Sequence, residues 1–577
     1  MAICPIIRTF AIMKYRNIII CLLFCTTWVY GGNLQVTPGQ LQELVNQNGM
    51  QNDKNLILSG SINGTDIKFL RNWLGNNGSR SLNLADCRIV AGGEAYYNDY
   101  HTEDDVIGDS MFCNNDLKSL ILPTTLKKIG NYALSFCGGT IEFPASLTWI
   151  GDHAFTQNMF THLHIPATLT HIGNGAFNGY IGLELTIDEN HPEFVMEDGF
   201  LYTRNHARLL GYYAAIGTKL EKLVFGSETR IIDDRALNSH RANSVKFNEG
   251  LESIGEEAFN YVLENGQEKL VIPNSVTHVG ARAFNNCRIN TLILSDNIER
   301  VEAEAFYSYN YKRIHLPNNL KWVGYRAFVN SEVINNENLP EGLETVEEGG
   351  FMGLRCSKLT IPKSLKNMGK EAFRGLSLTE TLDIQAELEN IPERAFYSCQ
   401  SLQKIILPPT VKRIGKSAFY QCHNLKSCRL PEGLEEIGEW AFAEAHFMSE
   451  WHIPASVKRI ESKAFYVFNH TFHDLYMYSQ KPPVETDPQA FYYWDMSLSV
   501  LYVPQGCIDN YKNLEPWCNF SNICEFDATD INGIQNSRHT SQPETHFSID
   551  GRLTNSSTKG LHIIKHQDGQ IKKVIVK

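Results

Sequence analysis

The sequence lacks the short motifs that mark the most easily recognised catalytic and metal sites. It contains no Cys-X-X-Cys pair and no HExxH, GxSxG or Walker-type stretch. Zinc sites built on paired cysteines, metalloprotease and serine-hydrolase sites and phosphate loops are therefore not indicated. We predict no catalytic residue, no metal ligand and no cofactor. A hydrolase whose residues meet only in the folded chain stays open as a minor alternative.

The chain also lacks an excess of positive charge and, beyond its beginning, any long apolar run. Its 577 residues include 52 basic and 64 acidic side chains, a net charge of −12. Such a balance argues against nucleic acid as a partner. After the first 32 residues no stretch reaches the roughly 20 apolar residues of a membrane span. We predict no transmembrane segment and a monomeric protein.

The beginning of the chain has the pattern of an export signal. Lys14 and Arg16 precede the apolar run 18–25, and two glycines follow at Gly31 and Gly32. This order of charged, apolar and small residues predicts a signal peptide over 1–32. Its removal takes away three of the 14 cysteines and leaves eleven, an odd number. At least one thiol then has no disulfide partner within the chain.

An internal repeat dominates the rest of the sequence. Variants of the phrase IGxxAF recur, and the aromatic or leucine position that ends the phrase returns roughly every 22 or 23 residues. One long gap, between Phe177 and Leu237, interrupts the series. Self-similarity at this period is the signature of a stacked repeat architecture. The series predicts about 16 coils.

One coil, SLQKIILPPTVKRIGKSAFYQC at 401–422, shows how the pattern folds. Apolar residues alternate with polar ones over 402–407, as in a short half-buried strand, and Pro408 ends it. Ile414 then turns inward, Gly415 permits a bend, and Phe419 fills the far wall of the coil. A single coil buries little surface, so stability must come from stacked neighbours.

The unit resembles the BspA-like class of leucine-rich repeats, with the form LxxIxLPxxLxxIGxxAFxxC. The resemblance covers roughly residues 107–525. It implies an α+β repeat solenoid of coils of about 22–23 residues, with short parallel strands on a concave face and a cap at both ends. We divide the chain into a signal peptide 1–32, an N-terminal cap 33–106, a solenoid 107–491 with a hairpin insertion at about 188–222, a C-terminal cap 492–526, a linker 527–546 and a small β tail 547–577.

The tail differs in charge from the body. It carries six basic and two acidic residues and alternates in short strands around Asp550–Gly551 and Asp568–Gly569. It resembles the C-terminal sorting tail of type IX secretion cargo, which implies a secreted protein held at the cell surface or outer membrane of a bacterium. A small terminal hairpin that docks on its own solenoid is the alternative.

The repeat leaves the solvent-facing strand positions open, and there we expect the functional residues. The candidates for partner binding are Arg313, His315, Lys358, Lys404, Arg429, His452, Tyr476 and Tyr502. Extended solenoid faces bind large partners through many contacts, with aromatic and arginine side chains as the usual hot spots. The family resemblance implies an adhesin-like protein that binds host or neighbouring-cell macromolecules. A glycan-binding accessory of a nutrient-uptake system is the alternative, with Tyr476, Tyr502, Trp451 and Trp494 stacking on sugars.

Other reactive side chains have a structural interpretation. The recurring cysteines, three residues after the aromatic position, predict a core ladder of Phe396, Phe419, Phe442, Cys399 and Cys422. The adjacent Cys422 and His423 then result from the register of the repeat. His162 and His164 lie on one face of a strand at a spacing that suits a metal, but variable surface is the preferred interpretation.

Overall fold

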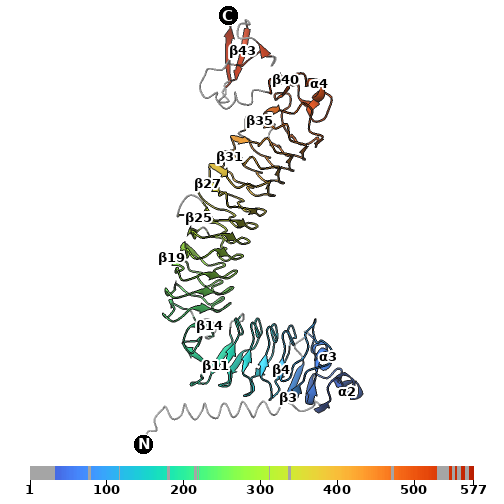
Figure 1. Cartoon of the computed structure of the whole chain (residues 1–577), viewed down its shortest axis with the longest axis vertical. Helices are drawn as coiled ribbons and strands as arrows, with labels where there is room; N and C mark the ends of the chain where they lie inside the picture. The colour runs from blue at the N-terminus through green and yellow to red at the C-terminus, as the bar shows by residue number, and fades with distance from the viewer. Residues whose placement is uncertain are drawn as a thin grey trace. The chain divides into compact units, whose positions relative to one another are not determined.

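The structure is a computed structural model that describes residues 33–528, apart from 76–79, 116, 179–181, 214–217, 219, 311, 335–338, 447 and 469–472, together with four strands between 545 and 576. The predicted signal peptide and most of the predicted linker lie outside the described residues. Contacts between residues group the chain into two compact units, 1–312 and 313–577. In each unit, short parallel strands follow one another along a stack of coils (Figure 1).

The first unit contains two ladders of parallel strands. The first ladder comprises β1 (Asn33–Val36), β2 (Asn55–Ile62), β3 (Ser81–Ile89), β5 (Ser119–Ile121), β7 (Ile141–Glu142), β9 (His162–Ile165), β11 (Glu184–Ile187), β15 (Leu223–Val224), β17 (Val245–Lys246), β19 (Gln267–Val271) and β21 (Ile289–Ile293). The second comprises β4 (Val106–Ile107), β6 (Lys128–Ile129), β8 (Trp149–Ile150), β10 (His171–Ile172), β16 (Ile231–Ile232), β18 (Ser253–Ile254), β20 (His278–Val279) and β22 (Arg300–Val301).

The second unit repeats this arrangement. Its first ladder comprises β23 (Lys312–His315), β25 (Ser331–Val333), β27 (Lys358–Ile361), β29 (Thr381–Ile384), β31 (Lys404–Ile406), β33 (Ser427–Arg429), β35 (Glu450–Ile453), β37 (Asp474–Met477), β39 (Val500–Pro504) and β40 (Asn522–Phe526). Its second comprises β24 (Trp322–Val323), β26 (Thr345–Val346), β28 (Asn367–Met368), β30 (Asn390–Ile391), β32 (Arg413–Ile414), β34 (Glu436–Ile437), β36 (Arg459–Ile460) and β38 (Glu485–Thr486).

The solenoid fold is confirmed, but the predicted number of coils is too low. The described part of the chain forms roughly 20 coils, against the 16 that the aromatic motif predicted. Strands β1 and β2 near the N-terminus, and β39 and β40 near the C-terminus, continue the first ladder without an IGxxAF phrase. Backbone pairing needs no particular side chain, so a count of aromatic residues misses these coils.

A third side of each coil is also joined to the next one by the backbone. Ser417, Phe419 and Gln421 donate N–H bonds of 2.8, 2.8 and 3.0 Å to carbonyls of the following coil. Gly415, at the bend of the coil, is needed because there is no room for a side chain at this position. A Cβ there would lie 2.8 Å from the carbonyl oxygen of Ile391 in the preceding coil. The repeat glycine therefore permits close approach between coils.

The aromatic position forms a continuous column in the core. The rings of Phe396 and Phe419 stack with centroids 5.4 Å apart, and those of Phe419 and Phe442 with centroids 5.3 Å apart. Cys399 and Cys422 are fully buried and remain separate thiols. Each thiol donates over 3.5 Å to the carbonyl of the phenylalanine one coil earlier, Phe373 and Phe396 respectively. The cysteine thus satisfies a buried carbonyl group.

Helices lie near the ends of the array. Helices α2 (Leu41–Gln47) and α3 (Gly64–Leu74) accompany the first strands, and the Asp66 carboxylate accepts bonds from the amides of Gly39 and Leu41. At the other end, α4 (Ile508–Tyr511) and the short helix η1 (Trp517–Asn519) bury Tyr511 and Trp517. The Trp517 ring packs 5.6 Å from Phe491. Apolar side chains thus cover the last coil.

Two segments depart from the plain coil. Strands β12 (Phe194–Glu197) and β13 (Phe200–Thr203) form an antiparallel hairpin, and β14 (Arg208–Tyr212) leads back to the second ladder. Asp198 and Gly199 at its turn have φ of 48° and 86°, as a tight two-residue hairpin loop requires. The tail forms an antiparallel sheet in the order β42-β41-β43-β44, with strands Leu553–Thr554, Thr545–Ser548, Gly560–Lys565 and Ile571–Val576.

Candidate functional site: the ladder face of the second unit

All eight predicted binding residues lie on first-ladder strands of the second unit. We call the solvent-facing side chains of β27, β29, β31, β33, β35, β37 and β39 the ladder face. The strand register aligns Lys358, Thr381 and Lys404 in one row, and it aligns Ile406 with Arg429 in another. Lys358, Lys404 and Arg429 are exposed. Three cationic side chains therefore lie within four neighbouring strands.

The two candidates on β23 differ from each other. Arg313 is exposed, whereas His315 is half-buried. The Nδ1 atom of His315 is buried and finds no hydrogen-bond partner among the described residues. Because its side chain is the more exposed of the two, Arg313 is the better placed of the pair for recognition.

The remaining three candidates form a stack of aromatic rings. The register pairs His452 of β35 with Tyr476 of β37, and Tyr476 with Tyr502 of β39. The His452 and Tyr476 rings lie 4.6 Å apart and 6° from parallel, and the two tyrosine rings 4.3 Å apart and 5° from parallel. In-register strands place equivalent side chains about 5 Å apart, which suits stacked rings. We call these three residues the aromatic stack.

Neighbouring groups hold the stack in place. His452 Nδ1 lies 3.0 Å from the Tyr478 hydroxyl, and its Nε2 lies 3.3 Å from the Glu450 carboxylate. Burial and the nearby Asp474 raise the pKa of Tyr502 to about 12. Burial, followed by the charge of Tyr502, raises the pKa of Tyr476 as well. Both phenols therefore remain protonated at neutral pH.

The sign of the charge changes along the ladder face. The row that begins with Lys358 and Lys404 continues, at the same position of each following coil, through Ser427 to Glu450, and Glu450 pairs in register with Asp474. Over β27–β33 the three cationic side chains outnumber the single acid Asp383, whereas over β35–β37 the face is acidic. A partner with the opposite order of charges would be oriented by this pattern.

The structure corrects the placement of two tryptophans. Trp451 and Trp494, which we expected to stack on sugars, have only 2% and 6% of their surface exposed. The Trp451 ring packs 4.8 Å from both Phe442 and Phe465, and the Trp494 ring packs 5.0 Å from Phe491. Both are core residues because they occupy inward positions of the repeat. Trp451 follows Glu450 on an alternating strand, and Trp494 stands three residues after Phe491, the place that cysteine takes in other coils.

The histidine pair His162 and His164 lies on β9 with exposed side chains. His162 Nε2 is 2.7 Å from Glu184, and His164 Nε2 is 3.5 Å from Asp188. Each ring thus has its own carboxylate partner on the neighbouring coil. The pair belongs to the charged surface of the first unit.

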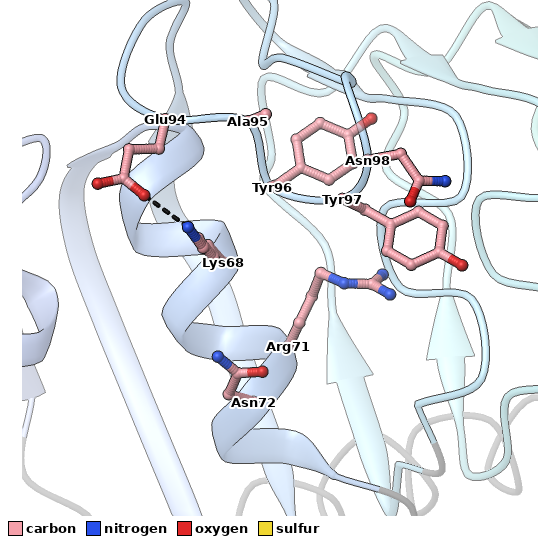
Figure 2. A pocket seen from close by; sticks show the side chains of 8 residues that line it. All are labelled: Lys68, Arg71, Asn72, Glu94, Ala95, Tyr96, Tyr97 and Asn98. Carbon is pink, nitrogen blue, oxygen red and sulfur yellow. Dashed lines mark hydrogen bonds and ion pairs between the residues drawn. The ribbon is translucent and has the colours of Figure 1, made fainter.

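A surface pocket of about 490 Å³ near the N-terminus was missed from the sequence. It lies beside α3, and its wall combines Arg71 with Tyr96 and Tyr97 (Figure 2). The Arg71 guanidinium sits 4.4 Å from the centre of the Tyr97 ring and donates to the carbonyl oxygen of Ser110 over 2.8 Å. Lys68 and Glu94 form an exposed ion pair of 2.6 Å at its edge. Arg71, Lys68 and Glu94, the charged residues of the pocket, therefore already have partners within the protein.

Stacked coils, parallel ladders and an inward column of leucine, isoleucine and phenylalanine define a leucine-rich-repeat solenoid, a class of protein that presents an extended binding surface. The chain belongs to the BspA-type leucine-rich repeat family. The family's region of six repeat copies matches residues 105–197, 208–264, 263–379 and 366–476. Repeat proteins of this kind are typically binding proteins.

Solved structures with the same kind of repeat are similar over much of the chain. A leucine-rich repeat protein from Bacteroides ovatus is 18% identical, with a TM-score of 0.35, over 70% of this chain and 88% of that one. A leucine rich cell surface protein from Faecalibacterium prausnitzii is 22% identical, with a TM-score of 0.30, over 54% and 86%. The pneumococcal vaccine antigen PcpA is 16% identical, with a TM-score of 0.26, over 73% and 77%. A comparison with curated proteins found no match.

None of the helices in the residues that the structure describes has the length and apolar character needed to cross a bilayer.

Proposed function

We propose that the protein is an exported, surface-displayed repeat protein that binds a protein ligand of the host or of a neighbouring cell through its ladder face. The observation that carries this proposal is the aromatic stack of β35, β37 and β39, with the exposed Arg429 on β33 one coil earlier. Tyrosine and arginine are the residues most enriched at binding hot spots, because each combines a large contact area with directional hydrogen bonds. Here they lie on rigid strands, so little conformational entropy is lost when a partner binds.

The geometry of the stack favours a protein ligand over a glycan. A sugar ring packs on the face of an aromatic side chain, yet both faces of Tyr476 are covered by His452 and Tyr502. The part of the half-buried Tyr476 that remains exposed is therefore its ring edge, and Phe526 packs at right angles to the same ring. Such a surface suits backbone carbonyls and polar side chains. The basic and acidic halves of the ladder face add orientation.

We also propose that the chain reaches the cell surface by means of its two ends. Residues 1–32 have the pattern of a signal peptide, and the basic tail 547–577 resembles a sorting tail of type IX secretion. The segment between them then forms the displayed region. The intact mass of the native protein tests this proposal, because loss of residues near Phe547 supports export-linked processing and retention of an unmodified tail contradicts it.

A binding panel tests the ligand class. The purified full chain is passed over immobilised extracellular matrix proteins, bacterial surface proteins and glycans. The proposal is supported if the chain is retained on a protein and if Lys404→Glu and Arg429→Glu each lower the affinity for that protein at least 10-fold. The control is Lys128→Glu, an exposed residue on the second ladder of the first unit, which should bind like the wild type. Retention on glycans alone supports the glycan alternative, and turnover of a panel substrate supports a hydrolase.

A further inference from the structure

Two histidines and a glutamate meet at the turns that precede β33 and β35. His423 and His446 occupy equivalent positions in neighbouring coils, each four residues after its core phenylalanine. Among the 16 coils that carry the aromatic motif, histidine stands at this position only in these two. Because equivalent residues of stacked coils lie side by side, the two imidazoles are neighbours. Their ring centroids are 5.3 Å apart.

Glu444 completes the cluster from the same turn as His446. Each of the three side chains offers a nitrogen or oxygen donor atom, and these atoms all lie within 4.8 Å of one another. His446 Nε2 contacts the Glu444 carboxylate directly. The backbone of Glu444 has φ of 66°, but Ser398 and Gln421 show 60° and 61° at the same place in other coils. The turn is therefore the ordinary one of the repeat, and the distinctive feature is its side chains.

The second nitrogen of His423 is held by the backbone. Its Nδ1 lies 3.2 Å from the carbonyl oxygen of Glu444. A carbonyl can only accept, so Nδ1 carries the proton and Nε2 of the neutral ring carries the lone pair. Metal-binding histidines use this arrangement, in which a backbone carbonyl fixes the tautomer and the orientation of the ring.

The charge of the cluster also suits a cation. The Glu444 side chain is only 12% exposed, and its ion-pair partner among the described residues is His446, at 30% exposure. A carboxylate that is largely withdrawn from water is costly without a positive charge nearby. A divalent ion between the three groups would supply that charge and would replace the contact between His446 and Glu444.

We propose that His423, Glu444 and His446 form a zinc-binding site that links two neighbouring coils beside the ladder face. Two imidazoles and one carboxylate match the ligand set of zinc sites that use three protein ligands and leave the fourth position to water or another ligand. Zinc–ligand bonds of roughly 2.0–2.2 Å place tetrahedral donors roughly 3.3–3.6 Å apart, so on binding small side-chain rotations separate His446 from Glu444 and bring His423 to the same distance. Cys422 takes no part, since its buried thiol donates to the Phe396 carbonyl.

The site adjoins the residues proposed to bind a partner. His423 precedes β33, which carries Arg429, and His446 precedes β35, which carries His452. An open coordination position there can accept a histidine or carboxylate from a bound protein. This inference is independent of the proposed function, since zinc binding is measured on the chain alone.

Titration of the metal-free full chain with zinc chloride, followed by calorimetry, tests the proposal. We expect one zinc ion per chain with a dissociation constant in the micromolar range or tighter. His446→Gln and Glu444→Gln should each weaken binding 10- to 100-fold. The matched control removes the two exposed histidines of β9, and His162→Gln combined with His164→Gln should leave the tight site unchanged.

Cobalt chloride gives a second readout on the wild-type protein. Tetrahedral coordination by nitrogen and oxygen donors produces visible absorption bands, which His423→Gln should abolish while the melting temperature of the metal-free variant stays that of the wild type. Absence of binding below about 100 μM zinc overturns the proposal. So does a site that survives His423→Gln combined with His446→Gln, or one that disappears in the His162/His164 control.

Discussion

The rings of Tyr476 and Tyr502 stack with centroids 4.3 Å apart on neighbouring strands, and His452 extends the stack on the other side. The three side chains come from three successive coils and are far apart in the sequence, yet the register places them directly opposite one another. A solenoid converts distant sequence positions into one continuous surface in this way. The chemistry of the surface is then set by the few positions that the repeat leaves variable.

Removal of the central ring should loosen the stack. Tyr476→Ala takes away two stacking contacts, each worth about 0.5–1.5 kcal/mol beyond buried area. We expect faster hydrogen exchange in β35, β37 and β39, with little change in the other strands of the unit. Val484→Ala, at a side chain 95% exposed, is the control and should leave exchange unchanged. Equal exchange in both variants would show that the stack adds no local stability.

The phenylalanine column should dominate the stability of the second unit. Phe419→Ala removes a fully buried ring between Phe396 and Phe442 and should cost about 3–5 kcal/mol in the free energy of unfolding. The exposed Lys404 of the same coil provides the control, since Lys404→Ala should change that free energy by less than about 0.5 kcal/mol. Urea unfolding followed by circular dichroism measures both. A loss below about 1 kcal/mol for Phe419→Ala would contradict the column's role.

The buried Lys312 predicts a pH dependence of stability. Burial lowers the pKa of Lys312 to about 7, and its Nζ donates to the carbonyl oxygen of Phe306. In the unfolded chain a lysine has a pKa of about 10.4. Between these values the unfolded state binds the additional proton, so this residue makes the protein more stable as pH rises from about 7 to about 10. Below about pH 7 the lysine is protonated in both states, and its burial lowers the free energy of unfolding by the full amount.

Substitution of Lys312 by methionine isolates that effect. Lys312→Met keeps the length of the side chain and removes the charge. Of the pH values tested, pH 7 should show the largest increase in the free energy of unfolding of the variant over the wild type. The gain should shrink by up to about 1.4 kcal/mol per pH unit as pH rises. Urea unfolding of both proteins at pH 7, 8 and 9 measures the difference, in which other titrating groups cancel. A difference that is constant with pH would contradict the assignment.

Thiol reactivity should follow position in the coil. Cys518 is exposed, whereas Cys287, Cys399 and Cys422 are buried. Burial raises the pKa of Cys287 to about 11 and that of Cys422 as well, which lowers their thiolate fraction. We expect a thiol reagent to label Cys518 within minutes in the native protein and the buried thiols only after unfolding. Mass spectrometry of the labelled peptides reads the order, and early labelling of Cys422 would contradict a sealed core.

Much of the fold could be predicted because each coil has the same local sequence pattern, and that pattern determines the local structure. The regular period of the IGxxAF phrase and the alternation in strands such as β31 are sufficient to predict parallel strands and a stacked core. The coils beyond the motif were missed because β1 and β40 join the ladder through backbone hydrogen bonds. Such bonds require no particular residue type, so the sequence does not reveal them. Trp451 and Trp494 were misplaced although the register itself assigns both to inward positions.

The proposed zinc site, in contrast, could not be predicted from the sequence. Its ligands lie in the turns of two successive coils, and a search for paired cysteines or for histidines within one strand does not compare neighbouring coils. The repeat register brings His423 and His446 together, but only the folded turn places the Glu444 carboxylate within reach of both. The adjacent Cys422 attracts notice in the sequence, whereas the structure assigns it to the core.

The sequence by itself determined the class of fold, the direction of the strands and which side chains form the core, because each follows from a short-range pattern repeated many times. The tertiary structure decided which variable side chains meet. Stacking of in-register strands covers the faces of Tyr476, reverses the charge along the ladder face and gathers His423, Glu444 and His446. These properties depend on distances between coils, which arise only when the backbone amides of one coil bond to the carbonyls of the next.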